Sequence, residues 1–434
     1  KETVMLHAAK LLDRCTRRDM LKLASFGALG TTVTGWMDIV SQTALAADAQ
    51  KQRKIPKNMI VLFMSGGPAH TFTFDLKKDG DRGCPYTPIA TSTPGIQISE
   101  YLPLVARQMH HVAVVRGMST GIADHGPAHY LMRTGFRQMA GIQHPHFASM
   151  AASKLIRDDN GMPSFVLLKP GSGSTLGCSN GFVDPSTRPL HLRDVSQGIA
   201  NLNPKDGVAA VQKRHGLLQD LDNGFLDEYQ ADAIKAKLDG YKKAVQLMDM
   251  EKARAAFQID KEPQAIRDLY GDTVFGKQCL GARRLIENGV RFVEVMHPKY
   301  WDTHGGAVKG QQKLTEELDR PMAALIEDLA QRGLLEDTLV VWMGEFGRDL
   351  SGNDHYAKAW TTCFAGGGVR GGQIIGRTDK KGMTVEERPV SVADFVASIY
   401  KGLGVDPLKK TWVRGRPIGL VDSNEPKPLD ELYS

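Results

Sequence analysis

Acidic and histidine side chains follow two short apolar runs in the second half of the chain. Glu345 comes directly after the run at residues 338–343, and a DTH triplet follows the run at residues 290–296. Carboxylate oxygens and imidazole nitrogens are ligands that divalent cations accept. The sequence therefore predicts a metal site here, and the alternative is a polar loop with a salt-bridged Glu345–Arg348 pair. The predicted ligands in this half are Asp302, His304, Glu345, Asp354 and His355.

Two earlier loops supply further candidates. His70 and Asp75 follow the apolar run at residues 58–64, after a pair of glycines that let the backbone turn sharply beside a ligand. His70 is a candidate acid, base or nucleophile, and Asp75 is a candidate metal ligand. The alternatives are a turn histidine bonded to backbone and an aspartate that caps the next segment. His125 and His129 are four residues apart and can share one helix face.

The elements that must position these residues are buried strands that alternate with helices. Apolar and β-branched runs of strand length predict strands, and apolar residues at spacings of three and four predict helices. This order indicates an α/β fold with a mostly parallel sheet, in which ligands bind beyond the carboxyl ends of the strands. The predicted strands are at residues 58–64, 112–116, 163–169, 290–296, 338–343 and 361–365, and the predicted helices at 217–250, 265–288, 314–329 and 392–403.

The composition is that of a globular protein. The chain has 434 residues, of which 41% are hydrophobic and 24% charged, which is enough for one large core or two smaller ones. The net charge of +6 is modest, and no basic block interleaved with aromatic residues appears. A role in nucleic-acid binding is therefore not expected.

The first residues have the features of a twin-arginine export signal. The segment TRRDMLK (residues 16–22) precedes a weakly apolar, uncharged run at 23–37, and the small-residue triplet ALA (44–46) follows. The apolar run is too short and too rich in Gly and Thr for a stable transmembrane segment. We therefore expect the twin-arginine translocase as a partner and a periplasmic or other extracytoplasmic location.

The cysteines give no zinc motif. Cys84, Cys178, Cys279 and Cys363 are far apart in sequence and form no CxxC pair. In an oxidising compartment they could form up to two disulfides, and buried free thiols are the alternative.

Six motifs carry a family resemblance: GGPAHTFTFD (66–75), HYLMRTG (129–135), WDTHGG (301–306), MGEFGR (343–348), NDH (353–355) and GGGVRGGQIIGRTD (366–379). Assembled, these stretches resemble a bacterial, twin-arginine-exported domain of unknown function that is related to sulfatases of the alkaline-phosphatase superfamily. The resemblance implies a three-layer α/β/α sandwich at residues 58–425, with a helical insertion near 215–260. Residues 1–46 would be the signal, 47–57 a linker and 426–434 a tail.

The chain also departs from the pattern of these relatives. Ala69 and Phe72 stand where the family usually has Ser and Asp, and Phe346 stands where the superfamily has a ligand His beside its acid. His125 occupies the position of the sulfatase nucleophile, which is a Cys or Ser two residues before Pro. The metal cage is therefore expected to persist while the hydrolytic chemistry is changed or lost.

The leading hypothesis is an exported metal-dependent hydrolase that acts on sulfate or phosphate esters, including those of anionic glycans. A divalent ion (zinc, calcium, magnesium or manganese) would polarise the ester, Arg348 would neutralise the oxyanion, and His125 or His70 would act as acid, base or nucleophile. The alternative is a non-catalytic, metal-containing binding protein for anionic glycans or cell-surface components. A transferase that moves a phosphoryl-linked group is a third possibility.

Overall fold

The computed structural model divides into two units, Lys1–Arg53 and Lys54–Ser434. It describes residues 55–77, 85–155, 161–171, 173–198, 202, 204–229, 240–241, 244–248 and 250–433, all within the second unit. The expected export signal, most of the expected linker and Cys84 lie outside the described residues.

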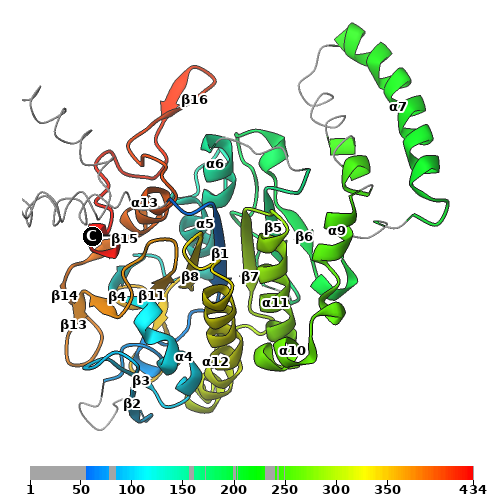
Figure 1. The fold of residues 1–434 in the computed structure, drawn as a ribbon. Helices are drawn as coiled ribbons and strands as arrows, with labels where there is room; N and C mark the ends of the chain where they lie inside the picture. The colour runs from blue at the N-terminus through cyan, green and yellow to red at the C-terminus, as the bar shows by residue number, and fades with distance from the viewer. Residues whose placement is uncertain are drawn as a thin grey trace, which may run out of the picture. The chain divides into compact units, whose positions relative to one another are not determined.

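A nine-stranded sheet organises the second unit, with the order β12-β4-β11-β8-β1-β7-β5-β6 and β15 paired to β4 (Figure 1). Every pairing in it is parallel except those of β11, which is antiparallel to β8 and β4. The predicted α/β fold with a mostly parallel sheet is confirmed. The strands are β1 (Asn58–Phe63), β4 (Val112–Ser119), β5 (Phe165–Leu168), β6 (Leu190–Leu192), β7 (Phe292–Met296), β8 (Thr338–Met343), β11 (Trp360–Ala365), β12 (Gln373–Ile375) and β15 (Val390–Ser391).

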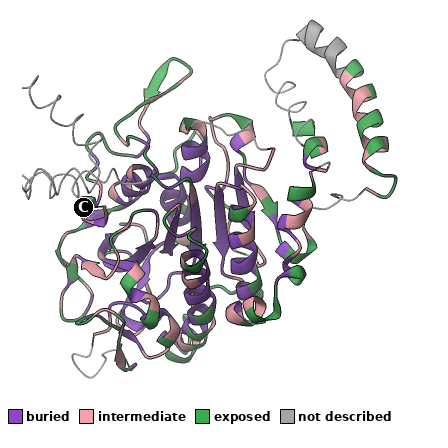
Figure 2. Cartoon of the chain, in the orientation of Figure 1, coloured by how far each residue is buried: buried purple, intermediate pink, exposed green. Residues whose placement is uncertain are grey.

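The central strands are apolar on both faces because helices cover both faces of the sheet (Figure 2). In β1, Ile60 and Leu62 pack toward α4, α11 and α12, whereas Val61 and Phe63 pack toward α5, α6 and α13. The result is a three-layer α/β/α arrangement. The helices are α4 (Pro103–Gln108), α5 (His125–Thr134), α6 (Phe147–Lys154), α7 (Val208–Tyr229), α9 (Glu251–Ala256), α10 (Gln264–Tyr270), α11 (Val274–Glu287), α12 (Ala307–Gln331) and α13 (Val392–Gly402).

Short two-stranded pairs lie outside the main sheet. They are β2 (Pro88–Ala90) with β3 (Gln97–Ser99), β9 (Gly347–Arg348) with β10 (His355–Tyr356), β13 (Arg377–Thr378) with β14 (Val385–Glu387), and β16 (Thr411–Val413) with β17 (Arg416–Ile418). The single helix predicted over 265–288 is two helices, because Gly271 ends α10 with a positive φ and Thr273 caps α11.

The described cysteines and the last residues lie in the core. Cys178, Cys279 and Cys363 are buried free thiols. Leu429 and Leu432, in the segment expected to be a tail, are buried against the layer formed by α13. None of the described helices combines the length and the apolar character needed to cross a membrane.

Candidate metal centre

Four segments that follow parallel strands meet at one edge of the sheet. Ser65 and Gly66 follow β1, Asp302 follows β7, and Glu345 follows β8. His125 is the first residue of α5, which comes after β4 and is capped by Asp124. Because β1, β4, β7 and β8 point the same way, their carboxyl ends place these residues together.

Gly66 permits the close approach of two of these segments. Its φ is +114°, and a Cβ atom built on it would lie 2.4 Å from the backbone nitrogen of Trp301 and 2.5 Å from that of Asp302. Only glycine fits such a conformation against a neighbouring backbone. The loop after β1 therefore packs directly against the loop that carries Asp302.

The β9–β10 pair brings His355 back to the same edge. In this antiparallel pair His355 lies opposite Arg348. The Arg348 guanidinium donates a hydrogen bond of 2.5 Å to Asp302 Oδ1, and others to the carbonyls of Gly66, Gly67 and Asn353. Arg348 is fully buried and ties the three loops together, so its observed contacts are those of a positioning residue rather than those of an anion-binding one.

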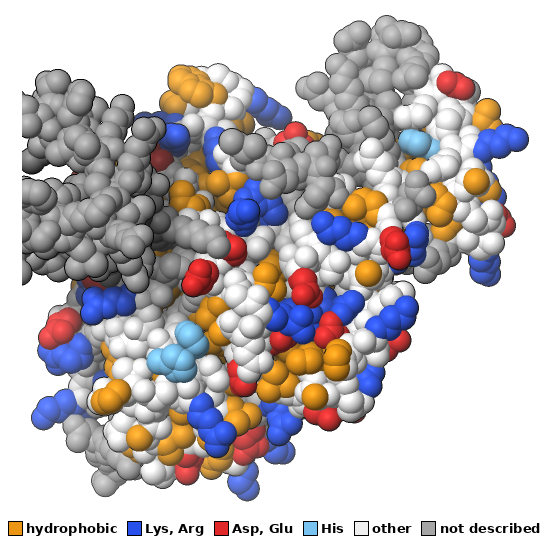
Figure 3. Space-filling model, in the orientation of Figure 1, with side chains coloured by type: hydrophobic (Ala, Val, Ile, Leu, Met, Phe, Trp, Pro, Cys, Tyr) orange, Lys and Arg blue, Asp and Glu red, His pale blue; other side chains and the backbone are white. Residues whose placement is uncertain are grey.

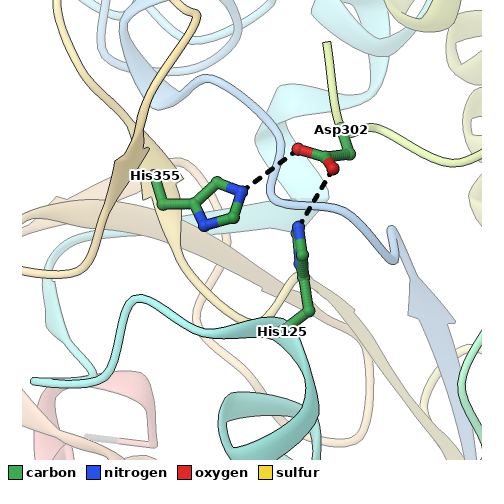
Figure 4. A group of neighbouring side chains, drawn as sticks. All are labelled: His125, Asp302 and His355. Atoms are coloured by element: carbon green, nitrogen blue, oxygen red, sulfur yellow. Dashed lines mark hydrogen bonds and ion pairs between the residues drawn. The ribbon is translucent and has the colours of Figure 1, made fainter. Parts of the chain in front are cut away.

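Three side chains form a group whose ligand atoms all lie within 4.8 Å of one another, namely His125, Asp302 and His355 (Figure 4). Nε2 of His355 lies 3.2 Å from Oδ1 of Asp302, and Nε2 of His125 lies 3.3 Å from Oδ2. His304 adds a further imidazole, with Nε2 at 2.9 Å from Asp302 Oδ1 and 3.1 Å from His355 Nε2. The structure thus brings three histidines around one carboxylate.

The hydrogen bonds behind two of these histidines direct their lone pairs toward Asp302. Nδ1 of His355 lies 2.8 Å from the carbonyl oxygen of Ala123, which can only accept, so Nδ1 carries the proton. Nδ1 of His125 likewise donates to Glu345 Oε1 at 2.7 Å. In the neutral form, each Nε2 then presents a lone pair to a carboxylate oxygen, an arrangement that a cation stabilises. Metal-bound histidines are oriented in this way by their second nitrogen.

Glu345 stands behind His125 rather than within the group of three. Its Oε1 accepts hydrogen bonds from Gly66 N at 2.7 Å and from His125, and it lies 3.2 Å from Nε2 of His129. The same Nε2 is 2.9 Å from the Ser65 hydroxyl. Oε2 of Glu345 is buried and has no hydrogen-bond partner among the described residues. Glu345 therefore orients His125 and retains one free oxygen beside the group.

The electrostatics favour ionised carboxylates. Burial raises the pKa of Glu345, but the charges and hydrogen bonds of His129 and His125 outweigh it and bring the pKa to about 2. Burial also raises the pKa of Asp302, and Arg348 outweighs it, so that pKa is lowered. For His125, burial lowers the pKa and the Glu345 carboxylate outweighs it, so the net shift is upward. Both acids are negatively charged at neutral pH.

The other residues predicted for the site lie elsewhere or point away. Asp354 is exposed and lies outside the group of three, although His355 is its neighbour in sequence. His70 is buried and its Nε2 donates to the carbonyl of Gly382 at 2.7 Å, as a turn histidine does. Asp75 is buried in a separate polar cluster, where it pairs with Arg116 and Lys77 and accepts from Thr378.

Three further residues contact the site, and the sequence predicts no role for them. The four-residue spacing of His125 and His129 places both on the face of α5 that reaches Glu345. The Phe346 ring packs against the imidazoles of His125 and His355, with centroids 4.9 and 4.7 Å apart. Tyr300 lies 5.1 Å from the His125 ring and is 40% exposed, so it borders the solvent side.

The fold and these side chains define an α/β protein with a candidate histidine–carboxylate metal centre at the carboxyl edge of its sheet. The chain belongs to the family described as "Protein of unknown function (DUF1501)", which matches residues 56–433. No curated protein matches the chain.

Solved structures with a similar arrangement include three hydrolases, all at low identity. The phosphonate monoester hydrolase SpPMH from Silicibacter pomeroyi is 11% identical, with a TM-score of 0.40, covering 87% of this chain and 76% of that one. The PsFucS1 sulfatase from Pseudoalteromonas sp. is 10% identical, with a TM-score of 0.37, covering 84% and 71%. The alkaline phosphatase from the Antarctic bacterium TAB5 is 12% identical, with a TM-score of 0.37, covering 81% and 99%.

Proposed function

We propose that this protein is an exported, metal-dependent hydrolase of sulfate or phosphate esters that uses one divalent cation. The observation that carries the proposal is the orientation of His125 and His355, whose Nδ1 atoms are held by Glu345 and the Ala123 carbonyl so that both Nε2 atoms face Asp302. His304 completes a set of three imidazoles and one carboxylate. Such a set favours zinc over calcium or magnesium, which prefer oxygen ligands.

The cation would polarise an ester oxygen and activate a water molecule. The chain's own residues then have separable roles. Arg348 fixes Asp302 in place, Glu345 fixes the tautomer of His125, and Tyr300 borders the open side where an ester would enter. The Phe346 ring packs against His125 and His355. By the family resemblance this is the position of a ligand His, so its replacement by Phe supports one ion rather than two.

The metal can be tested by elemental analysis of the natively purified protein and by titration of the metal-free protein with Zn²⁺. We expect stoichiometric binding that is lost when Asp302→Ala and His355→Ala are combined. The control is Asp354→Ala, an exposed acid adjacent to His355. If the double variant binds Zn²⁺ like the wild type, the proposed site is wrong.

A binding function without turnover is the second candidate. It is favoured by Arg348, whose guanidinium is directed to protein acceptors, and by His125, which takes the place of a reactive Cys or Ser. A screen of aryl sulfate and aryl phosphate esters with the metal-loaded protein separates the two. Turnover that His125→Ala abolishes supports the hydrolase, whereas metal binding without turnover supports the binding protein.

A further inference from the structure

The β16–β17 hairpin and its approach, residues 408–418, form an exposed element that the metal centre does not use; we call it the basic hairpin. It projects from the body beside α13 and α6 (Figure 1). Trp412 is 72% exposed and Leu408 is 62% exposed, the highest values among the large hydrophobic side chains that the structure describes. Both side chains are therefore available for contact with a partner.

The charges of this element have one sign. Its basic residues are all exposed, and the nearest acid in sequence, Asp406, accepts a hydrogen bond from the backbone of Leu408. Burial lowers the pKa of Lys154, at the end of α6, and the nearby positive charge of Lys409 lowers it further. Within the described part of the chain, no salt bridge involves any of these five cations: Lys154, Lys409, Lys410, Arg414 and Arg416.

The turn of the hairpin places a cation at its tip against the local backbone preference. Val413 pairs with Arg416, so the turn consists of Arg414 and Gly415, with φ values of 48° and 76°. Two positive φ values make a turn that favours Asn-Gly, and arginine is a poor choice for its first position. The residue is therefore unfavourable for the turn but adds charge at its most exposed point.

The two faces of the hairpin differ. Thr411 pairs with Ile418, and the Thr411 hydroxyl contacts Met150 of α6, so this pair faces the body. Trp412 pairs with Pro417, and both are exposed, so this pair faces outward. Hydrophobic and basic side chains are both visible on the projecting element in Figure 3.

We infer that the basic hairpin docks the protein onto an anionic lipid surface, with Trp412 and Leu408 entering the headgroup region and the cations facing the lipid charges. Tryptophan and basic residues are the side chains favoured at such an interface. An anionic polysaccharide would share the charge, but its hydroxyls need hydrogen-bond acceptors as well as donors. The exposed side chains of the hairpin are cationic or apolar and include no amide or carboxylate.

The position of the hairpin in the fold is compatible with docking onto a membrane. α13 ends at Gly402, which lies against Leu339 near the start of β8, and Gly404 lies against Ile55, before β1. The hairpin is thus at the amino edge of the sheet, opposite the metal centre. Docking at this edge leaves the centre facing away from the membrane, and the inference does not depend on which reaction the centre performs.

The test is flotation of the full-length protein with vesicles of phosphatidylcholine alone or with 30% phosphatidylglycerol. We expect binding only to the anionic vesicles, weakened about tenfold or more by Lys409→Gln with Lys410→Gln, since each basic residue contributes several-fold. The matched control is Lys380→Gln with Lys381→Gln, an exposed lysine pair next to β13. Arg414→Asn removes one positive charge and places a residue that favours the positive φ of the turn. Any loss of binding in this variant cannot come from unfolding of the hairpin, and we expect binding to weaken several-fold.

Tryptophan fluorescence gives a second readout. Trp412 is the exposed tryptophan of the described region, because Trp301, Trp342 and Trp360 are buried. A blue shift on adding anionic vesicles that Trp412→Phe removes would support insertion. The inference is overturned if the hairpin variants bind the vesicles as the control does. It is also overturned if they lose binding only to a sulfated polysaccharide such as heparin.

Discussion

Replacing Glu345 by leucine tests how the metal centre is supported. The carboxylate is buried and holds both the Gly66 N–H and the Nδ1–H of His125 at 2.7 Å. Both bonds are accepted by the same oxygen, Oε1, so a glutamine amide oxygen could keep them, whereas leucine has a similar volume and no acceptor and loses both. His125 then loses the contact that fixes its tautomer while its own ligand atom is unchanged.

The expected effect on metal affinity follows from the loss of the hydrogen bond to Nδ1 of His125. Removing the hydrogen-bond partner of a metal-bound histidine weakens metal binding about 10- to 100-fold, or about 1.4–2.7 kcal/mol. Competition between Glu345→Leu and a chromophoric chelator for Zn²⁺ measures this directly. Thermal unfolding in excess chelator shows whether the metal-free variant is still folded.

Two outcomes would refute this reasoning. If Glu345→Leu binds Zn²⁺ within twofold of the wild type, Glu345 does not orient a ligand. If Asp354→Asn, at an exposed position beside His355, weakens binding by the same factor, the effect reflects loss of local charge and not of orientation.

Three further predictions concern the structure around the centre. Gly66→Ala forces a Cβ atom to within 2.4 Å of the Trp301 nitrogen at a φ of +114°, so we expect a cost of at least 1–3 kcal/mol in urea unfolding together with loss of bound metal. Burial raises the pKa of Glu294, but the charge of Arg133 and the hydrogen bond of His146 bring it to about 2, below its ordinary 4.5. The stabilisation from Glu294, about 3 kcal/mol, is therefore complete above about pH 4.5 and is lost as the pH falls toward 2, and Glu294→Gln should flatten the pH dependence of unfolding in this window. Saturating Zn²⁺ at about 100 times its dissociation constant should add about 2.7 kcal/mol to the wild type, seen as a higher melting temperature that a chelator reverses, and should add nothing to the Asp302→Ala, His355→Ala protein.

The sequence by itself determined six of the nine strands of the sheet and the edge where the chemistry gathers, whereas the short strands β6, β12 and β15 were not predicted. β1 and β8 lie within a residue of their predicted limits, because strands covered on both faces are continuous apolar runs with clear ends. The rule that ligands bind beyond the carboxyl ends of parallel strands then brought Asp302, His125 and His355 to one place.

Only the tertiary structure decided which way each side chain points. Asp354 and His355 are adjacent in sequence, yet the β9–β10 pairing turns His355 toward Asp302 and leaves Asp354 in solvent. Asp75 pairs with Arg116, a residue distant in sequence. Such outcomes depend on the register between loops and on close approaches such as that of Gly66, which arise from packing of distant segments and leave no periodic pattern in the sequence.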